Sequence, residues 1–141
     1  MIWTVMLVSF LVTAAVLIHY EMLYRLATLM PGKATSHRYY VLVGVLGSLC
    51  AHAIEVWLFA FGYYFMVNSR VFGALQGNFN NTLLDCSYFS FTTYSTLGVG
   101  DIEPVGHIRF LMGLESLTGL VLITWTASFM FVEMQKFWEH K

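Results

Sequence analysis

Residues 95–101 read Ser-Thr-Leu-Gly-Val-Gly-Asp and carry groups that can replace the water around a metal cation. A dehydrated cation needs oxygen ligands, and rings of backbone carbonyls supply them. Gly98 and Gly100 alternate with larger residues, and because glycine adopts backbone angles denied to other residues, successive carbonyls can point the same way. We expect the ligands to be the hydroxyl of Thr96 and the carbonyls of four residues, Thr96, Leu97, Gly98 and Val99, with Gly100 forming the outer mouth.

The composition places this segment in a membrane protein. Of the 141 residues, 58% are hydrophobic and only 11% are charged, and the mean hydropathy is +0.69. A soluble domain has about a quarter of its residues charged. The net charge of −1 provides no basic surface for nucleic acid. Two cysteines are too few for a disulfide framework.

Three apolar runs, 2–22, 40–67 and about 105–134, are long enough to cross the membrane, since roughly 30 Å of hydrocarbon takes about 20 helical residues. A further run, 83–94, is too short to span. The first run lacks the basic start of a signal peptide, so we expect it to be retained as a helix. No soluble domain separates the runs, which predicts a single membrane domain over residues 1–141.

The basic residues predict how the chain is oriented in the cell's inner (plasma) membrane. Only Arg70 and Arg109 lie on one side of the predicted spans. The other side holds five basic residues, Arg25, Lys33, Arg38, Lys136 and Lys141. Because basic residues favour the cytoplasmic side, we expect the N terminus outside, the C terminus in the cytoplasm and three crossings.

The segment between the second and third spans must therefore leave and re-enter the membrane on its outer face. We expect residues 83–94 to form a short helix that enters the membrane and residues 95–101 to return as extended chain. Non-helical backbone at membrane depth is tolerated only where it is buried in protein or lines a water-filled path. The alternative is an ordinary glycine-rich turn between two helices, which does not explain why a marginal helix precedes it.

The segment Thr96-Leu97-Gly98-Val99-Gly100-Asp101 resembles the selectivity filter of the potassium channel pore-domain family, in which backbone carbonyls replace the hydration shell of the ion. Pro104 lies three residues past the acid, Arg109 opens the following helix, and Gly119 matches the family's inner-helix hinge. The resemblance covers about residues 40–134. The first helix has no counterpart in the simplest members of the family.

The resemblance implies an all-α membrane protein with three transmembrane helices, a re-entrant pore helix and a filter loop. It divides the chain into an additional N-terminal helix (1–25), an outer helix (39–67), a pore helix with filter (82–101) and an inner helix (105–134). It implies passive potassium conduction, no enzymatic activity and no cofactor beyond the permeant potassium ions. One filter strand cannot surround a cation, so four copies are required and a homotetramer is expected.

Two residues depart from the family pattern and bear on selectivity. Val99 stands where the family has an aromatic residue that packs against the pore helix and fixes the width of the filter. Thr92 stands where the simplest bacterial members carry an acid that pairs with the filter acid, so the sequence does not identify the partner of Asp101. We expect potassium selectivity, with a non-selective monovalent cation channel as the alternative.

One stripe of the inner helix is expected to face the central cavity. Its members follow Gly119 at helical spacing, and the family register orients them inward: Leu120, Ile123, Thr124, Ala127, Ser128 and Phe131. Without that register, the same stripe is compatible with simple helix–helix packing through small residues.

Three ionisable residues, His52, Glu55 and Glu115, lie within the apolar runs. Such residues are costly inside a membrane and usually face protein. We expect Glu55 and Glu115 to support the filter from behind, together with Thr92 and Asp101, by accepting hydrogen bonds from pore-helix hydroxyls such as Ser90, Thr92 or Tyr94. The alternative is a structural hydrogen bond without effect on conduction.

Other classes of membrane protein are alternatives to the channel. A haem protein would need His19 and His52 at one depth, but counting from Arg25 and Arg38 separates them by roughly 12 Å at 1.5 Å per residue. A metal site at His52, Glu55 and Glu115 is a further alternative, as is a non-conducting accessory subunit of another channel.

Overall fold

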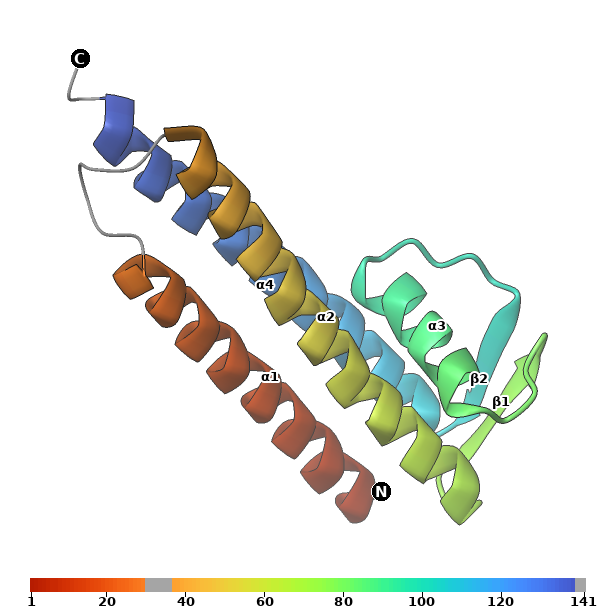
Figure 1. The fold of residues 1–141 in the computed structure, drawn as a ribbon. Coiled ribbons are helices and arrows are strands. Elements are labelled where there is room, and N and C mark those ends of the chain that lie inside the picture. Colours follow the sequence, from red (N-terminus) through yellow and green to blue (C-terminus); the bar gives the residue numbers. More distant parts are fainter. Residues whose placement is uncertain (30–36, 139–141) are drawn as a thin grey trace.

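The computed structural model describes residues 1–29 and 37–138. Lys33 and Lys141, on which the expected orientation partly depends, lie outside the described residues. The elements follow one another as α1 (Ile2–Leu29), α2 (His37–Ser69), β1 (Gly73–Gly77), α3 (Leu83–Tyr94), β2 (Ile102–Gly106) and α4 (Ile108–Trp138). Three long helices lie side by side, with α3 and the strands at one end of the bundle (Figure 1).

Within the described residues, three helices are long and apolar enough to cross a membrane: α1, α2 and α4. The helix α2 contacts all the other helices, and α1 and α3 lie on opposite sides of the α2–α4 pair (Figure 1). The fold is thus mostly helical, and the chain is a multi-pass membrane protein.

The additional helix α1 packs through a single stripe of residues. Its buried positions recur every three or four residues, the spacing of one helical face: Thr4, Val8, Leu11, Ala15, His19, Leu23 and Leu26. Gly62 on α2 makes room for this stripe, since a Cβ there would come within 2.6 Å of a methyl group of Leu11. The remaining faces of α1 are apolar and exposed, as expected for a helix in contact with lipid.

The short helix α3 starts at a well-formed cap. Thr82 accepts a hydrogen bond from the Asp85 N–H, and the Asp85 carboxylate accepts one from the Thr82 N–H, which completes a capping box. The Asn80 N–H also donates to Asp85 and holds the pKa of that carboxyl below its usual value of 3.8. The cap fixes the start of α3 at the end of the bundle, and its last turn reaches toward the middle of the long helices (Figure 1).

Two short strands join the chain entering α3 to the chain leaving it. Strand β1 pairs antiparallel with β2, with Gly73 opposite Gly106 and Gly77 opposite Ile102. The pairing extends toward the filter segment because the Asn78 N–H donates to the Asp101 carbonyl at 2.9 Å. The expected all-α class is therefore wrong in one respect, because the fold also contains these two strands. Each strand is a short apolar stretch next to glycines, too short to be predicted from the sequence.

The strands also change the limits of the last helix. The apolar run beginning at 105 was expected to be helical throughout, but residues 102–106 form β2 and the helix begins at Ile108. Pro104 lies within that strand, opposite Leu75. A proline has no N–H and is compatible with a strand only at an edge or end, and this two-stranded sheet consists of edges alone.

Gly77 should be sensitive to substitution because it lies at the end of the sheet next to the filter. Its φ is +99°, and an added Cβ would lie 2.2 Å from the Asp101 carbonyl oxygen. We expect Gly77→Ala to destabilise the protein by more than about 1 kcal/mol, measured as a lower thermal midpoint in detergent. The control is Gly113→Ala on α4, where a Cβ meets nothing within 4 Å; equal midpoints for both variants would contradict the prediction.

Candidate functional site

The filter segment alternates in backbone conformation. Thr96, Gly98 and Gly100 have positive φ values of 59°, 56° and 83°, whereas Leu97 and Val99 do not. When left-handed residues alternate with residues of negative φ, successive peptide units turn so that their carbonyl groups can point to the same side. The left-handed conformation at Thr96 is uncommon for a residue with a branched side chain. This segment therefore has the backbone expected of a row of carbonyl ligands.

The filter is attached to α3 by backbone hydrogen bonds. The Gly98 N–H donates to the Thr92 carbonyl at 3.0 Å, and the Thr96 N–H donates to the Thr93 carbonyl at 2.9 Å. The hydroxyl of Thr92 donates to the Phe89 carbonyl within its own helix. Thr92 thus contacts the filter through its backbone, and its side chain is not engaged with Asp101.

The sequence did not identify a partner for Asp101, and Tyr88 of α3 lies near its carboxylate. Desolvation and, after it, the Asp101 carboxylate raise the pKa of the Tyr88 hydroxyl. Tyr88 lies on the same helix as Thr92, and the Asp101 carbonyl accepts a hydrogen bond from the Asn78 N–H.

Glu115 on α4 is fully buried behind α3. Its Oε1 lies 2.5 Å from the Ser90 hydroxyl, and its Oε2 accepts a hydrogen bond of 2.5 Å from Tyr63. The Ser90 hydroxyl also lies 2.9 Å from the Val56 carbonyl. Ser90 was among the expected partners, whereas Tyr63 was not. Because a buried carboxylate is tolerated only with donors around it, this arrangement ties α3 to both α2 and α4.

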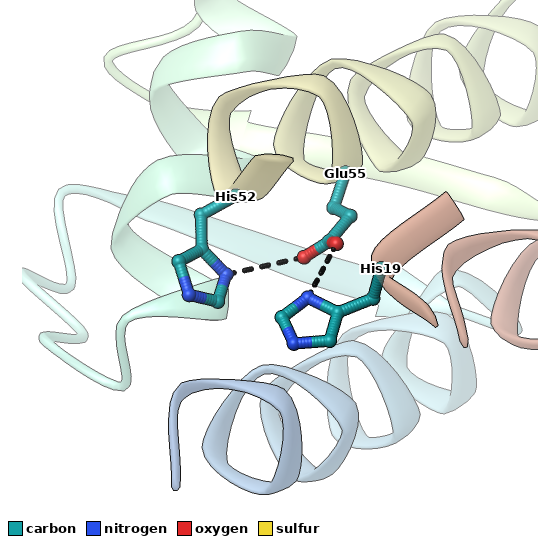
Figure 2. A group of neighbouring side chains, drawn as sticks. All are labelled: His19, His52 and Glu55. Atoms are coloured by element: carbon teal, nitrogen blue, oxygen red, sulfur yellow. Dashed lines mark hydrogen bonds and ion pairs between the residues drawn. The ribbon is translucent and has the colours of Figure 1, made fainter. Parts of the chain in front are cut away.

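Glu55 on α2 is also fully buried and collects polar groups from several helices. Its Oε1 lies 2.8 Å from Nδ1 of His19 on α1. Its Oε2 accepts a hydrogen bond from the Tyr94 hydroxyl and lies 3.2 Å from Nδ1 of His52. Both imidazoles point toward the Glu55 carboxylate (Figure 2). Tyr94 was an expected partner, and His52 was placed beside Glu55 only in the alternative of a metal site, whereas His19 was not expected here.

The depth argument against pairing His19 with His52 is wrong. Their ring centroids are 5.2 Å apart, and both Nε2 atoms face the Thr126 hydroxyl, at 3.3 Å for His19 and 3.0 Å for His52. Counting from Arg25 and Arg38 assumed that both residues mark one membrane level. However, α1 continues to Leu29, so His19 lies deeper than that count allowed.

The alternative of a metal site at His52, Glu55 and Glu115 is wrong, because these three side chains do not come together. Glu115 is engaged with Ser90 and Tyr63, and in its place His19 joins His52 and Glu55, with nitrogen and oxygen atoms within 4.8 Å of one another. The two imidazoles contact different oxygens of Glu55, and each ring nitrogen already has a hydrogen-bond partner. The ring nitrogens and carboxylate oxygens therefore form a closed hydrogen-bonded group, in which each candidate ligand atom already has a partner.

Gly119 lies where α4 approaches the last turn of α3. A Cβ at this position would come within 2.2 Å of the Tyr94 carbonyl oxygen. The helix α4 runs without interruption from Ile108 to Trp138 through this contact. The glycine therefore allows close packing of the two helices, and its role as a hinge stays a prediction.

The expected cavity stripe of α4 is exposed on the single chain, whereas Glu115, Thr118 and Leu122 on the same helix are buried. All six expected members are exposed or half-buried without a covering element: Leu120, Ile123, Thr124, Ala127, Ser128 and Phe131. Leu120 and Thr96 both line a hollow of about 530 Å³. The face that the chain leaves uncovered is thus continuous with the inner end of the filter.

Taken together, the fold and the site define a membrane protein in which a short helix and a glycine-rich strand re-enter between two spanning helices. The model of the ion channel family matches residues 51–136, more than half of the chain. The chain belongs to this ion channel family, which confirms the resemblance to the potassium channel pore domain. It is accordingly a channel-family protein and not an enzyme. No curated protein and no solved structure gives a significant match.

The support behind α3 should depend on the Ser90 hydroxyl. Ser90→Ala removes one donor from buried Glu115, and leaving a buried polar group without its partner costs about 1–3 kcal/mol. We expect a lower thermal midpoint in detergent. Ser87→Ala is the matched control, because that hydroxyl donates to Leu84 within its own helix. Should both serine variants unfold at the same temperature, the Ser90–Glu115 contact contributes no stability.

Proposed function

We propose that four copies of this chain form a channel that conducts potassium passively through residues 96–100. The ligands are the Thr96 hydroxyl and the backbone carbonyls of the four proposed site residues, Thr96, Leu97, Gly98 and Val99, with Gly100 at the outer mouth. The alternating left-handed conformation of Thr96, Gly98 and Gly100 is the observation that carries this proposal. The left-handed conformation is unfavourable for Thr96. At Gly98 and Gly100 it is not required by close packing, because an added Cβ would meet nothing within 4 Å.

A homotetramer follows from the ligand requirement of the cation. One strand supplies a quarter of each carbonyl ring, and the filter side chains Leu97 and Val99 are 69% and 54% exposed on the single chain. Large exposed apolar side chains next to a polar backbone favour burial against further protein. The exposed stripe of α4 then lines the cavity below the filter, and the negative end of the α3 dipole favours a cation there.

The proposed orientation has the N terminus outside and the C terminus in the cytoplasm. The strands and the outer end of the filter lie at the same end of the bundle as the N terminus, and the end of α4 lies at the other (Figure 1). The distribution of lysine and arginine supports this assignment.

A filter with relaxed selectivity is the second candidate, because Val99 replaces the family's aromatic residue. The α3 side chains near this level include Phe91, which is exposed, and Phe89, which is buried against Tyr63. Neither offers a polar partner that would hold residue 99 in place. Carbonyl ligation is unaffected by this difference, whereas the stiffness of the ring depends on it.

Gly98→Ala tests the conduction path. A non-glycine residue in the left-handed region costs roughly 1–2 kcal/mol, and four copies in one ring multiply the strain. We expect potassium flux into proteoliposomes to be lost while native mass spectrometry still gives about four times 16.1 kDa. Gly113→Ala, which adds the same methyl group in unstrained helix, should conduct normally. Undiminished flux through Gly98→Ala would place the conduction path elsewhere, and a conducting monomer or dimer would exclude the tetramer.

Val99→Tyr tests the selectivity. Wild type should show measurable sodium permeability when potassium is withdrawn, and the tyrosine, by packing against α3, should reduce that permeability. The measurement is a series of reversal potentials in sodium–potassium mixtures. Val99→Ile is the control for added volume without a ring. If wild type excludes sodium as sharply as Val99→Tyr does, selectivity depends on the number of carbonyl ligands and not on the residue at position 99.

A further inference from the structure

Five side chains form a closed ring of hydrogen-bonding contacts across all four helices. Starting at Glu55 Oε1, the ring passes to His19 Nδ1 (2.8 Å), from His19 Nε2 to Thr126 Oγ1 (3.3 Å), and from there to His52 Nε2 (3.0 Å). It continues from His52 Nδ1 to the Tyr94 hydroxyl (2.9 Å) and closes through the hydrogen bond from Tyr94 to Glu55 Oε2. Figure 2 shows the two histidines and the carboxylate between them.

The number of protons available decides the state of this ring. Each of the five contacts needs one proton. The further contact between His52 Nδ1 and Glu55 Oε2, at 3.2 Å, adds no proton to the count, because the same nitrogen already faces the Tyr94 hydroxyl and one N–H can serve both oxygens. The two hydroxyls and two neutral imidazoles supply one each, and an ionised Glu55 supplies none. One contact then has lone pairs on both sides. A fifth proton, on the carboxylate or on either imidazole, completes every contact in the ring.

The net charge of the ring also favours five protons over four. With four protons the ring holds one uncompensated negative charge, at a place where His19 and Glu55 are fully buried. Burying an unpaired charge in a membrane interior is strongly unfavourable. With five protons the ring is neutral, whether the acid is protonated or a protonated histidine faces the carboxylate.

We propose that the ring of His19, Glu55, His52, Tyr94 and Thr126 is a binding site for one proton per chain. The other groups around it do not alter the count. Trp125 of α4 lies against the His19 ring with centroids 5.2 Å apart. Glu115, the nearby carboxylate of α4, is engaged with Ser90 and Tyr63 outside the ring.

A route to the site is present at His52. Its side chain is 17% exposed, and a hollow of about 480 Å³ is lined by His52, Tyr94 and Thr126 of the ring and also by Ser95, the residue before Thr96. This hollow is the path by which protons would reach the ring.

The ring acts on the filter through Tyr94, and this consequence rests on the proposed function. Tyr94 is the last residue of α3 and precedes Thr96 by two positions. Its hydroxyl lies in the ring, and its carbonyl lies at the close contact with Gly119. Losing the fifth proton leaves one contact without a proton in a ring that holds the Tyr94 hydroxyl, so flux should depend on pH.

Two substitutions test the proton count without removing the ring. Glu55→Gln supplies the fifth proton permanently through its amide, and should behave as the protonated form at every pH. Thr126→Val removes the bridge between the two Nε2 atoms, so three contacts remain for three protons and only the charge of Glu55 still favours the additional proton. Thr118→Val is the control, since the Thr118 hydroxyl donates to Leu114 in its own helix.

The measurement is proton uptake by the full chain in lipid nanodiscs between about pH 5 and 8, where histidine normally titrates. Potentiometric titration should give one proton per chain more for wild type than for Glu55→Gln. Thr126→Val should bind that proton at least tenfold more weakly, and Thr118→Val as wild type does. Nitrogen NMR of labelled histidine should show the His19 and His52 signals changing together in wild type and staying constant in Glu55→Gln.

Equal proton uptake by wild type and Glu55→Gln would overturn the proposal. So would one divalent metal ion per chain, found by elemental analysis in wild type and lost in Glu55→Gln. Flux measured on the same samples tests the coupling separately: pH-dependent flux in wild type and pH-independent flux in Glu55→Gln support it. Uptake with pH-independent flux in both overturns the coupling alone, and uptake without any flux overturns the proposed function while leaving the proton site established.

Discussion

Backbone that leaves a helix in the middle of a membrane must be buried in protein or line a water-filled path, and the rest of this structure follows from that constraint. Beyond the last turn of α3, the Thr96 and Gly98 N–H groups donate to the Thr93 and Thr92 carbonyls. The helix behind them is held by two buried carboxylates, one reached by Ser90 and the other by Tyr94. The strands β1 and β2 close the loop at its outer end. Each of these features holds residues 95–101 and the helix before them in place, because residues 95–101 lack the regular backbone hydrogen bonds of a helix or a sheet.

The sequence carried the parts of the fold that have strong periodic or compositional signals. The three spans are long apolar runs, and the short helix is a run too short to span. The strands could not be predicted, since two five-residue segments that include glycines show no periodicity that separates them from a loop. Their existence depends on β1 and β2 meeting in space, which a single segment does not encode.

The residues of the candidate site could be predicted where their type alone excluded a lipid-facing position. The glycines of the filter and the buried acids were identified because neither suits a lipid-facing helix. The partners of those acids were partly missed, because depth was counted along each helix from its nearest basic residue. The depth of a residue in the membrane depends on the length of its helix and on how far that helix is shifted along its neighbours. These two factors place His19 next to Glu55, although the residue count had separated His19 from His52. Tyr63 and Tyr88 were missed because a tyrosine in an apolar run is indistinguishable from packing until its hydroxyl has a partner.

The placement of His19 on α1 bears on how the pore can be divided. The family match begins at residue 51, within α2, so α1 lies wholly outside it. Yet α1 supplies His19, one of the four side chains that form the ring together with Glu55, and its Leu11 fills the space left by Gly62. The two-helix pore is therefore not a self-contained module in this chain. Recombining α2, α3 and α4 with other segments in place of α1 would leave Glu55 without the contact that His19 makes with its Oε1.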